Sequence, residues 1–153
     1  MTEVNDDLDL HAAADLARLT CACFALRQAA RQTTRLYETE LSKAGLSPGQ
    51  FSILSALVLH EELPFSVLAE ELGLERTSLS RALRPLARDG RVTLSPEGPR
   101  RRRSARITPD GRRTYAEAFP FWQRAQAEAA QQFGSTDWPA LAERLSRLSE
   151  AKT

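Results

Sequence analysis

The feature that most constrains the fold of this chain is an uninterrupted run from His11 to Lys43 that contains neither proline nor glycine. Apolar side chains recur along this run at spacings of three and four residues, which is the pattern of one face of an α-helix. They are Leu16, Leu19, Cys23, Leu26, Ala30, Tyr37 and Leu41. A single helix of this length would extend about 50 Å at about 1.5 Å per residue. Because a small core cannot cover such a helix from one side, we expect part of it to meet another subunit.

Signals for shorter helices follow this run. Ser47 to Gln50 has the spacing of a capping box with a proline in the first helical position, so a second helix is expected to start there. Ser66 is expected to cap a third helix that stops at Gly73. A fourth helix is predicted over residues 76–88, separated from the third by a very short turn.

The rest of the chain predicts a β-hairpin and two more helices. Residues 92–94 and 105–107 alternate between apolar and polar around a proline-containing turn, which is the signature of a hairpin. A helix with a kink at Pro120 is expected from Thr108, and a last helix from near Thr136. The inward residues of the last helix are expected to be Leu141, Leu145 and Leu148. The predicted fold is therefore mainly α-helical with a small hairpin.

The third and fourth predicted helices have the spacing of a helix-turn-helix. Ala69 lets the two helices approach, Gly73 takes the turn, and Leu79 holds the second helix against the first. At about 100° per residue, the second helix has two different sides. The apolar side carries Leu79, Ala82, Leu83 and Leu86, and the opposite side carries Thr77, Arg81, Arg84 and Arg88. Such a helix can rest on a core and place its polar side in a DNA major groove.

The net charge of +1 conceals a strong asymmetry along the chain. Residues 76–113 hold twelve arginines and three acids, a local charge of +9, whereas the remaining residues sum to −8. Every base in this segment is arginine, which favours bidentate contacts to phosphate and guanine over a merely solvated face. We therefore expect duplex DNA as the partner. The candidate DNA-binding residues are Arg76, Thr77, Ser78, Ser80, Arg81, Arg84, Arg100, Arg101, Arg102 and Arg103.

Several segments of the chain, in the order in which they occur, resemble the MarR family of transcriptional regulators. The resemblance covers nearly the whole sequence. These segments are Ser47–Phe51, Leu68–Leu74, Arg76–Arg81, Arg88–Val92, the arginine run and Ile107–Gly111. The resemblance implies a winged helix-turn-helix homodimer that reads a palindromic operator, most often as a repressor. It divides the chain into an N-terminal dimerisation helix (1–45), a DNA-binding domain (46–108) and C-terminal dimerisation helices (109–153). The family usually braces its wing arginine with an aspartate two residues earlier, where this sequence has Pro99 before Arg101.

Three hypotheses remain for an effector. Cys23–Leu26 resembles the start of the organic-hydroperoxide-sensing branch of the family, in which a cysteine is oxidised and a tyrosine fourteen residues later, here Tyr37, helps to position it. A pocket for a small aromatic ligand and the absence of any effector are the alternatives. In a continuous helix the side chains of Cys21 and Cys23 diverge by about 200°, which excludes a disulfide between them, and both also suit the role of small buried hydrophobes.

Other functional classes find little support in the sequence. His11 and His60 are far apart and lack companion ligands, so no zinc site is expected, and no catalytic constellation or cofactor motif stands out. The chain is therefore not expected to be an enzyme. The acidic first ten residues are unlike a signal peptide, and no apolar segment is long enough for a membrane anchor, so a cytoplasmic protein is expected. The main alternative is a winged-helix module that binds protein, which would not need a segment of charge +9.

Overall fold

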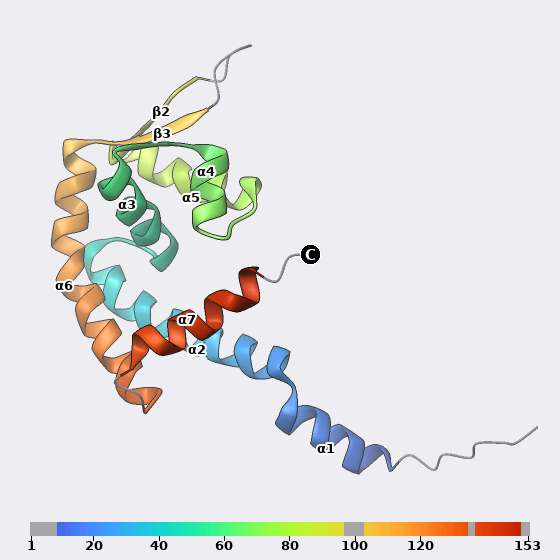
Figure 1. Cartoon of the computed structure of the whole chain (residues 1–153). Coiled ribbons are helices and arrows are strands. Elements are labelled where there is room, and N and C mark those ends of the chain that lie inside the picture. Colours follow the sequence, from blue (N-terminus) through green and yellow to red (C-terminus); the bar gives the residue numbers. More distant parts are fainter. Residues whose placement is uncertain (1–8, 97–102, 135–136, 151–153) are drawn as a thin grey trace, which may run out of the picture. The chain divides into compact units, whose positions relative to one another are not determined.

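A computed structural model describes residues 9–96, 103–134 and 137–150, together with the side chains of these residues up to 147 (Figure 1). The chain divides between Arg35 and Leu36 into two compact units. Within the described ranges, no helix combines the length and the apolar composition that crossing a membrane requires.

Residues 10–41 form two helices where the sequence predicts one. Helix α1 (Leu10–Thr20) ends at Cys21, whose backbone is extended with ψ of 107°, and α2 (Ala22–Leu41) begins directly after it. The Cys21 sulfur accepts a hydrogen bond from the backbone N–H of Phe24 at 3.4 Å, as a capping side chain does. The prediction of a continuous helix is therefore wrong at Cys21, because a cysteine can end one helix and cap the next without any proline or glycine.

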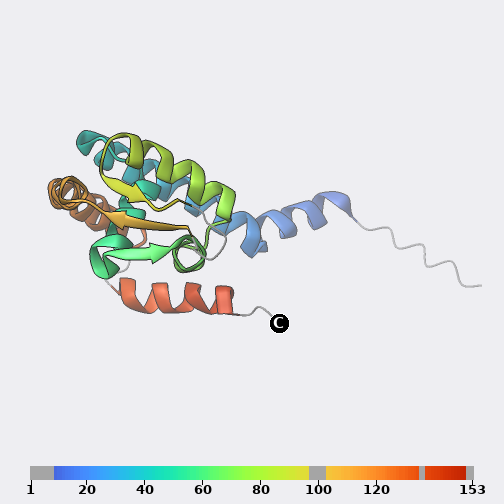
Figure 2. The same ribbon diagram turned by 90° about the horizontal axis from the view of Figure 1, so that it is seen from above.

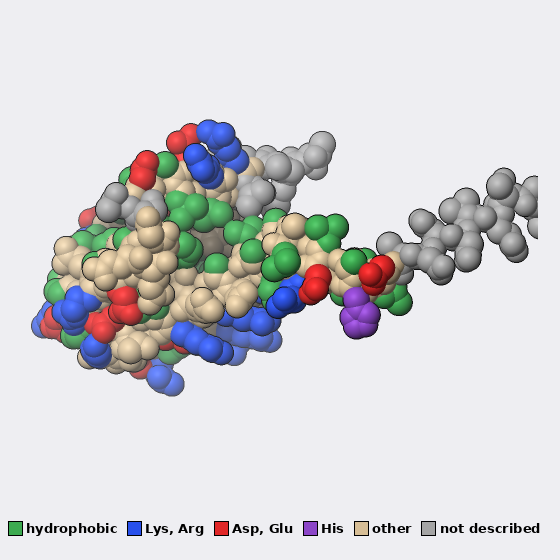
Figure 3. Space-filling view, turned by 90° about the horizontal axis from the view of Figure 1, so that it is seen from below, with side chains coloured by type: hydrophobic (Ala, Val, Ile, Leu, Met, Phe, Trp, Pro, Cys, Tyr) green, Lys and Arg blue, Asp and Glu red, His purple; other side chains and the backbone are tan. Residues whose placement is uncertain are grey.

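The apolar stripe of these helices lies largely at the surface of the chain. Hydrophobic side chains lie at the surface of this part of the chain (Figure 3). No residue of α1 is buried, and Leu19 is 76% exposed. The other large apolar side chains exposed in the first unit are Leu10, Leu16, Phe24 and Leu26. Cys21 and Cys23 are exposed as well. Both thiols are therefore accessible in the described part of the single chain, and their burial as small hydrophobes in a dimer stays a prediction.

The second unit combines helices with one antiparallel sheet of strand order β1-β3-β2 (Figure 2). After the end of α2, its elements are the short helix η1 (Ser42–Ala44), α3 (Pro48–His60), β1 (Glu62–Pro64), α4 (Phe65–Glu71), α5 (Arg76–Arg88), β2 (Val92–Leu94), β3 (Ser104–Ile107), α6 (Pro109–Gln132) and α7 (Trp138–Glu150). The core is formed by apolar side chains from α3, α4, α5, the sheet and α6. This arrangement is a winged helix-turn-helix, as the sequence predicts.

Several predicted boundaries are confirmed. The Ser47 hydroxyl accepts from the Gln50 N–H at 3.2 Å, and the Gln50 side chain accepts from the Ser47 N–H at 2.9 Å, which completes the predicted capping box. Helix α5 has the predicted bounds. Thr108 caps α6, which continues through Pro120. The kink expected at that proline stays a prediction.

Three local expectations are wrong. Helix α4 begins at Phe65 after Pro64, so Ser66 does not cap it. Strand β1, which pairs with β3, was not expected. Its three residues are too few to show an alternating pattern in the sequence. In α7, Leu141 is half-buried and Leu145 is 38% exposed rather than buried, and the side chain of Leu148 lies outside the described residues.

The connection between α3 and β1 consists of a single strained residue. Glu61 has φ of 63° and ψ of −49°, a backbone conformation that non-glycine residues rarely adopt. Its N–H donates to the Leu57 oxygen at 2.9 Å, and its carbonyl accepts from the Ile107 N–H at 3.0 Å. The Glu61 carboxylate also pairs with Arg112 of α6 at 3.1 Å. Contacts to α3, β3 and α6 therefore hold this conformation in place.

Candidate DNA-binding interface

The two sides of α5 lie as the sequence predicts. Leu79, Leu83 and Leu86 are completely buried. Arg81 and Arg84 are exposed on the opposite side of the helix. Gly73 adopts φ of 62° in the turn before α5, a conformation that favours glycine. The helix-turn-helix thus rests on its leucines and presents its arginines to solvent.

The other polar candidates on α5 are also accessible. Arg76, Thr77 and Ser78 are exposed in the first turn, and Ser80 is half-buried. Backbone N–H groups in the first turn of a helix have no partner within the helix, so this end of α5 can donate hydrogen bonds together with its hydroxyl groups. The structure therefore brings the α5 candidates together on one accessible surface.

Contacts within the second unit divide the arginines of residues 76–113 into two groups. Five arginines interact with acceptors: Arg88 with Asp89, Arg91 with the Gly45 carbonyl, Arg106 with Glu62, Arg112 with Glu61 and Arg113 with Asp110. By contrast, Arg76, Arg81 and Arg84 have no ion pair or hydrogen bond to a side-chain acceptor among the described residues. Among the described arginines of this segment, the charges left without an acceptor on the protein are therefore these three on α5 and that of Arg103.

The predicted wing, formed by β2, β3 and the residues between them, is only partly described. Arg100, Arg101 and Arg102 lie outside the described residues. Arg103 is exposed, and its guanidinium carbon lies 4.9 Å from the ring centroid of Phe65. Sequence reasoning did not single out Phe65, because nothing in its local pattern shows that it lies beside the arginine run.

A polar network holds the base of the wing. The Ser104 N–H donates to the Ser95 hydroxyl at 2.8 Å, and the Ser104 hydroxyl donates to the Glu62 carboxylate, which also pairs with Arg106. These residues come from β1, β3 and the end of β2. Sequence reasoning missed this network because strand pairing alone brings its members together.

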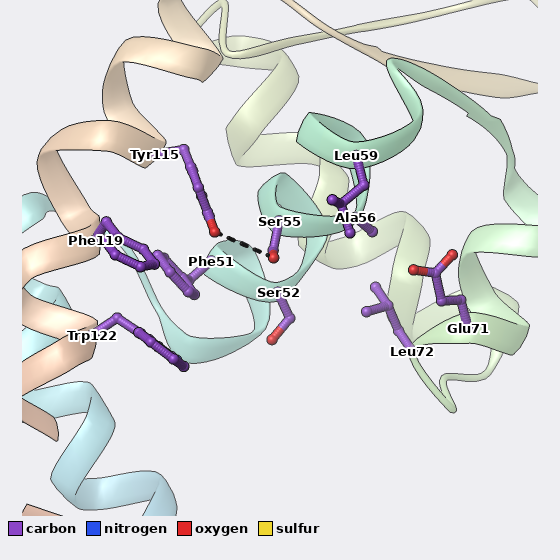
Figure 4. Close-up of a pocket in the computed structure, with 10 residues that line it drawn as sticks. All are labelled: Phe51, Ser52, Ser55, Ala56, Leu59, Glu71, Leu72, Tyr115, Phe119 and Trp122. Carbon is purple, nitrogen blue, oxygen red and sulfur yellow. Dashed lines mark hydrogen bonds between the residues drawn. The ribbon is translucent and has the colours of Figure 1, made fainter. Parts of the chain in front are cut away.

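A pocket of about 340 Å³ lies between α3, α4 and α6 in the second unit (Figure 4). The Phe51 ring stacks on Tyr115 and Trp122 with centroid distances of 5.0 and 6.0 Å. The Ser55 and Tyr115 hydroxyl groups lie 3.5 Å apart, and Ser52 also lines the pocket. Tyr115, Phe119 and Trp122 of α6 line this space between helices.

Cys23 and Tyr37, the two residues of the redox hypothesis, belong to different units and contact different residues. Cys23 belongs to the first unit, where its sulfur lies 3.4 Å from a guanidinium nitrogen of Arg27. Tyr37 belongs to the second unit, and its hydroxyl donates to the side-chain oxygen of Gln126 in α6. Burial raises the pKa of Tyr37 above its usual value, so the hydroxyl remains a donor at neutral pH.

The histidines show no sign of a metal site. His11 and His60 are both exposed, and His60 lies 3.6 Å from Glu71. Among the residues for which the structure gives side chains, no group of histidine, cysteine and acidic residues could hold a metal ion.

Comparisons with known proteins agree on one family. A sequence model described as MarR family matches residues 44–103. Crystal structures of the transcriptional regulator MosR from M. tuberculosis are 35% identical to this chain. The first has a TM-score of 0.77 and covers 88% of this chain and 97% of that chain. The second, a complex with DNA, has a TM-score of 0.75 and covers 86% and 95%.

More distant structures share the fold. BpsR from Bordetella bronchiseptica, described with regulation of its DNA binding by 6-hydroxynicotinic acid, has a TM-score of 0.74 at 19% identity, covering 85% of this chain and 94% of that chain. PcaV from Streptomyces coelicolor, in complex with its natural ligand, has a TM-score of 0.76 at 22% identity, covering 89% and 96%. No curated protein sequence matches significantly. The winged helix-turn-helix, the family match and the identity to MosR together show that the chain belongs to the MarR family of DNA-binding transcriptional regulators.

Proposed function

We propose that the protein is a homodimeric repressor that binds a palindromic operator through α5 and the wing. The observation that carries this proposal is the surface of α5, where Arg76, Arg81 and Arg84 are free of acidic partners among the described residues. The exposed apolar side chains of α1 and α2 support the dimer, because exposed apolar surface often marks a contact with another chain.

Each group of candidate residues has a role in this proposal. Arg81 and Arg84 contact guanine O6 and N7 in the major groove, and Thr77, Ser78 and Ser80 donate to bases and phosphates nearby. Arg76 neutralises a phosphate. The arginine run 100–103 contacts phosphates or enters the minor groove. Two-fold symmetry places the half-sites about 10 base pairs apart.

Two measurements on the whole chain test this proposal. Sedimentation at micromolar concentration should give a dimer, and a duplex from the DNA next to the protein's own gene should be bound in a salt-dependent manner. A monomer that shifts neither this duplex nor random-sequence DNA would contradict the proposal. That outcome would favour the alternative of a winged-helix module that binds protein.

We also propose that a small aromatic ligand bound in the pocket between α3, α4 and α6 releases the protein from DNA. The stacked rings of Phe51, Tyr115 and Trp122 offer apolar faces, and the hydroxyl groups of Ser55 and Tyr115 offer polar contacts. The volume of about 340 Å³ lies within the range of small-molecule sites. The ligand-regulated BpsR and the ligand-bound PcaV, which share the fold, support a ligand of this class.

Tryptophan fluorescence should report the ligand directly. Only two tryptophans are present, so Trp138→Phe leaves Trp122 in the pocket as the single probe. We expect 6-hydroxynicotinic acid or a related aromatic acid to quench Trp122 and to lower DNA affinity about tenfold. Ser52→Phe should fill the pocket and remove both effects, whereas Ser42→Phe, on η1, should retain them. If the ligand still lowered the DNA affinity of Ser52→Phe, the effector site would lie elsewhere in the protein.

Thiol oxidation is the second candidate for release, because the exposed Cys23 sulfur lies 3.4 Å from the Arg27 guanidinium. The Cys23 thiolate would attack the terminal oxygen of an organic hydroperoxide and break the O–O bond. This step yields a sulfenic acid and an alkoxide, which takes a proton from water to become an alcohol. We expect stoichiometric hydroperoxide to lower the DNA affinity of the wild type and of Cys21→Ser, but not of Cys23→Ser. Equal affinity in every sample would leave Cys23 without a sensing role.

A further inference from the structure

The contact between Phe65 and Arg103 joins the first helix of the helix-turn-helix to the wing. Phe65 is the first residue of α4, and its side chain is buried, with 6% exposed. The Arg103 guanidinium lies over the face of this ring, 4.9 Å from its centroid. The backbone is fixed at the same place, because the Phe65 N–H donates to the Arg103 carbonyl at 2.9 Å. Arg103 is therefore held by both its main chain and its side chain.

An aromatic ring holds an arginine differently from a carboxylate. A carboxylate neutralises the charge and accepts the N–H groups, as Glu62 of β1 does for Arg106 of β3. An aromatic ring attracts the cation through its negative face, but it accepts no hydrogen bond from the N–H groups that lie in the plane of the guanidinium. The guanidinium of Arg103 therefore keeps its charge and its donors while losing freedom of movement. This is the arrangement that favours binding of a second, external anion.

The position of this contact at the base of the wing favours a DNA backbone phosphate as the external anion. Arg103 is the last member of the arginine run and lies directly before β3, at the base of the wing. Arg106, three residues later, and Arg112 and Arg113 on α6 are each paired with a carboxylate. Among the described arginines between the end of α5 and residue 113, Arg103 alone is not bonded to an oxygen acceptor of the protein.

We propose that Phe65 is a positioning residue that orients Arg103 toward a DNA backbone phosphate at the base of the wing. This inference rests on the proposed DNA-binding function. The ring replaces an acidic brace, so the arginine is fixed without loss of its charge. A purely structural role is the competing explanation, in which the arginine stem only shields the ring from water.

A double-mutant cycle separates the two explanations. The probe is a fluorescent random-sequence 30-base-pair duplex, titrated with the full chain at several KCl concentrations, because a phosphate contact affects every sequence. Arg103→Ala should weaken binding and reduce the salt slope by about one unit for each subunit engaged. Phe65→Leu should weaken binding about threefold while Arg103 is present. In the Arg103→Ala background, Phe65→Leu should have no further effect.

The controls make each outcome decisive. Arg106→Ala removes a nearby arginine, on β3, that already pairs with Glu62, and should change affinity less than twofold. Thermal unfolding checks the fold of each variant, and Phe65→Met repeats the cycle if the leucine variant does not fold. Unchanged affinity in Arg103→Ala, or an equal loss from Phe65→Leu with and without Arg103, would overturn the inference. Absence of binding by the wild type would instead overturn the proposed function itself.

Discussion

Gly111→Ala is expected to lower the free energy of unfolding by about 3 kcal/mol, the upper end of ordinary overpacking. Gly111 is buried in the first turn of α6, where a Cβ would overlap the backbone oxygen of Arg91 and approach a side-chain carbon of Ile107 to 2.9 Å. The backbone cannot yield locally, because the Thr108 N–H donates to the same Arg91 oxygen at 3.1 Å. A new methyl group must therefore push α6 away from the segment that joins α5 to β2.

Thermal unfolding measures this effect, and Gly49→Ala is a matched control. Gly49 lies in the first turn of α3, and a Cβ there meets nothing within 4 Å. Alanine should stabilise that helix by up to about 1 kcal/mol. For a domain of this size, 3 kcal/mol corresponds to a fall of roughly 10 °C in Tm. Equal Tm values for the two variants would show that α6 tolerates the extra methyl group.

Arg81→Ala and Arg84→Ala are each expected to weaken binding to the cognate site by roughly 1–3 kcal/mol and to relax the preference for particular bases. Both side chains are exposed on α5, opposite the buried leucines, and neither has an acidic partner among the described residues. Little internal rearrangement is therefore needed before they contact DNA. Affinity should be measured on selected operator fragments and on single-base variants of them.

Arg112→Ala is the matched control for these substitutions. Arg112 is exposed and belongs to the same basic segment, but it pairs with Glu61 at 3.1 Å. Its loss should change DNA affinity by less than about 0.5 kcal/mol, since an exposed pair of this kind contributes little. If Arg112→Ala weakened binding as much as Arg81→Ala, the total charge of the segment would matter, rather than the arginines of α5.

The bounds of helices and strands were predicted best where the local sequence pattern agrees with the packing of the fold. The bounds of α5 follow from its two-sided composition, and the start of α3 follows from its capping box. The break at Cys21 could not be predicted, because a sulfur that accepts a backbone N–H leaves no distinctive sequence pattern. Strand β1 could not be predicted either, since its three residues are defined by pairing with β3, about forty residues later in the chain.

For the candidate interface, the sequence showed where the arginines are but not which of them are neutralised. Glu61 and Glu62 lie outside the basic segment and pair with Arg112 and Arg106 inside it. Counting charges along the chain cannot reveal such pairs, because the fold creates them. The position of Phe65 beside Arg103 was hidden for the same reason.

The strained backbone at Glu61 limits how α3 and the sheet can move relative to each other. Ser52 and Ser55 of α3 line the pocket, and β1 begins one residue after Glu61. A flexible loop between two elements would absorb a rotation of either one. Glu61 has little backbone freedom left, so a rotation of α3 around a ligand must turn β1 with it. Phe65 follows β1 directly and contacts Arg103. An aromatic molecule bound in the pocket would therefore change the position of Arg103 relative to the DNA backbone.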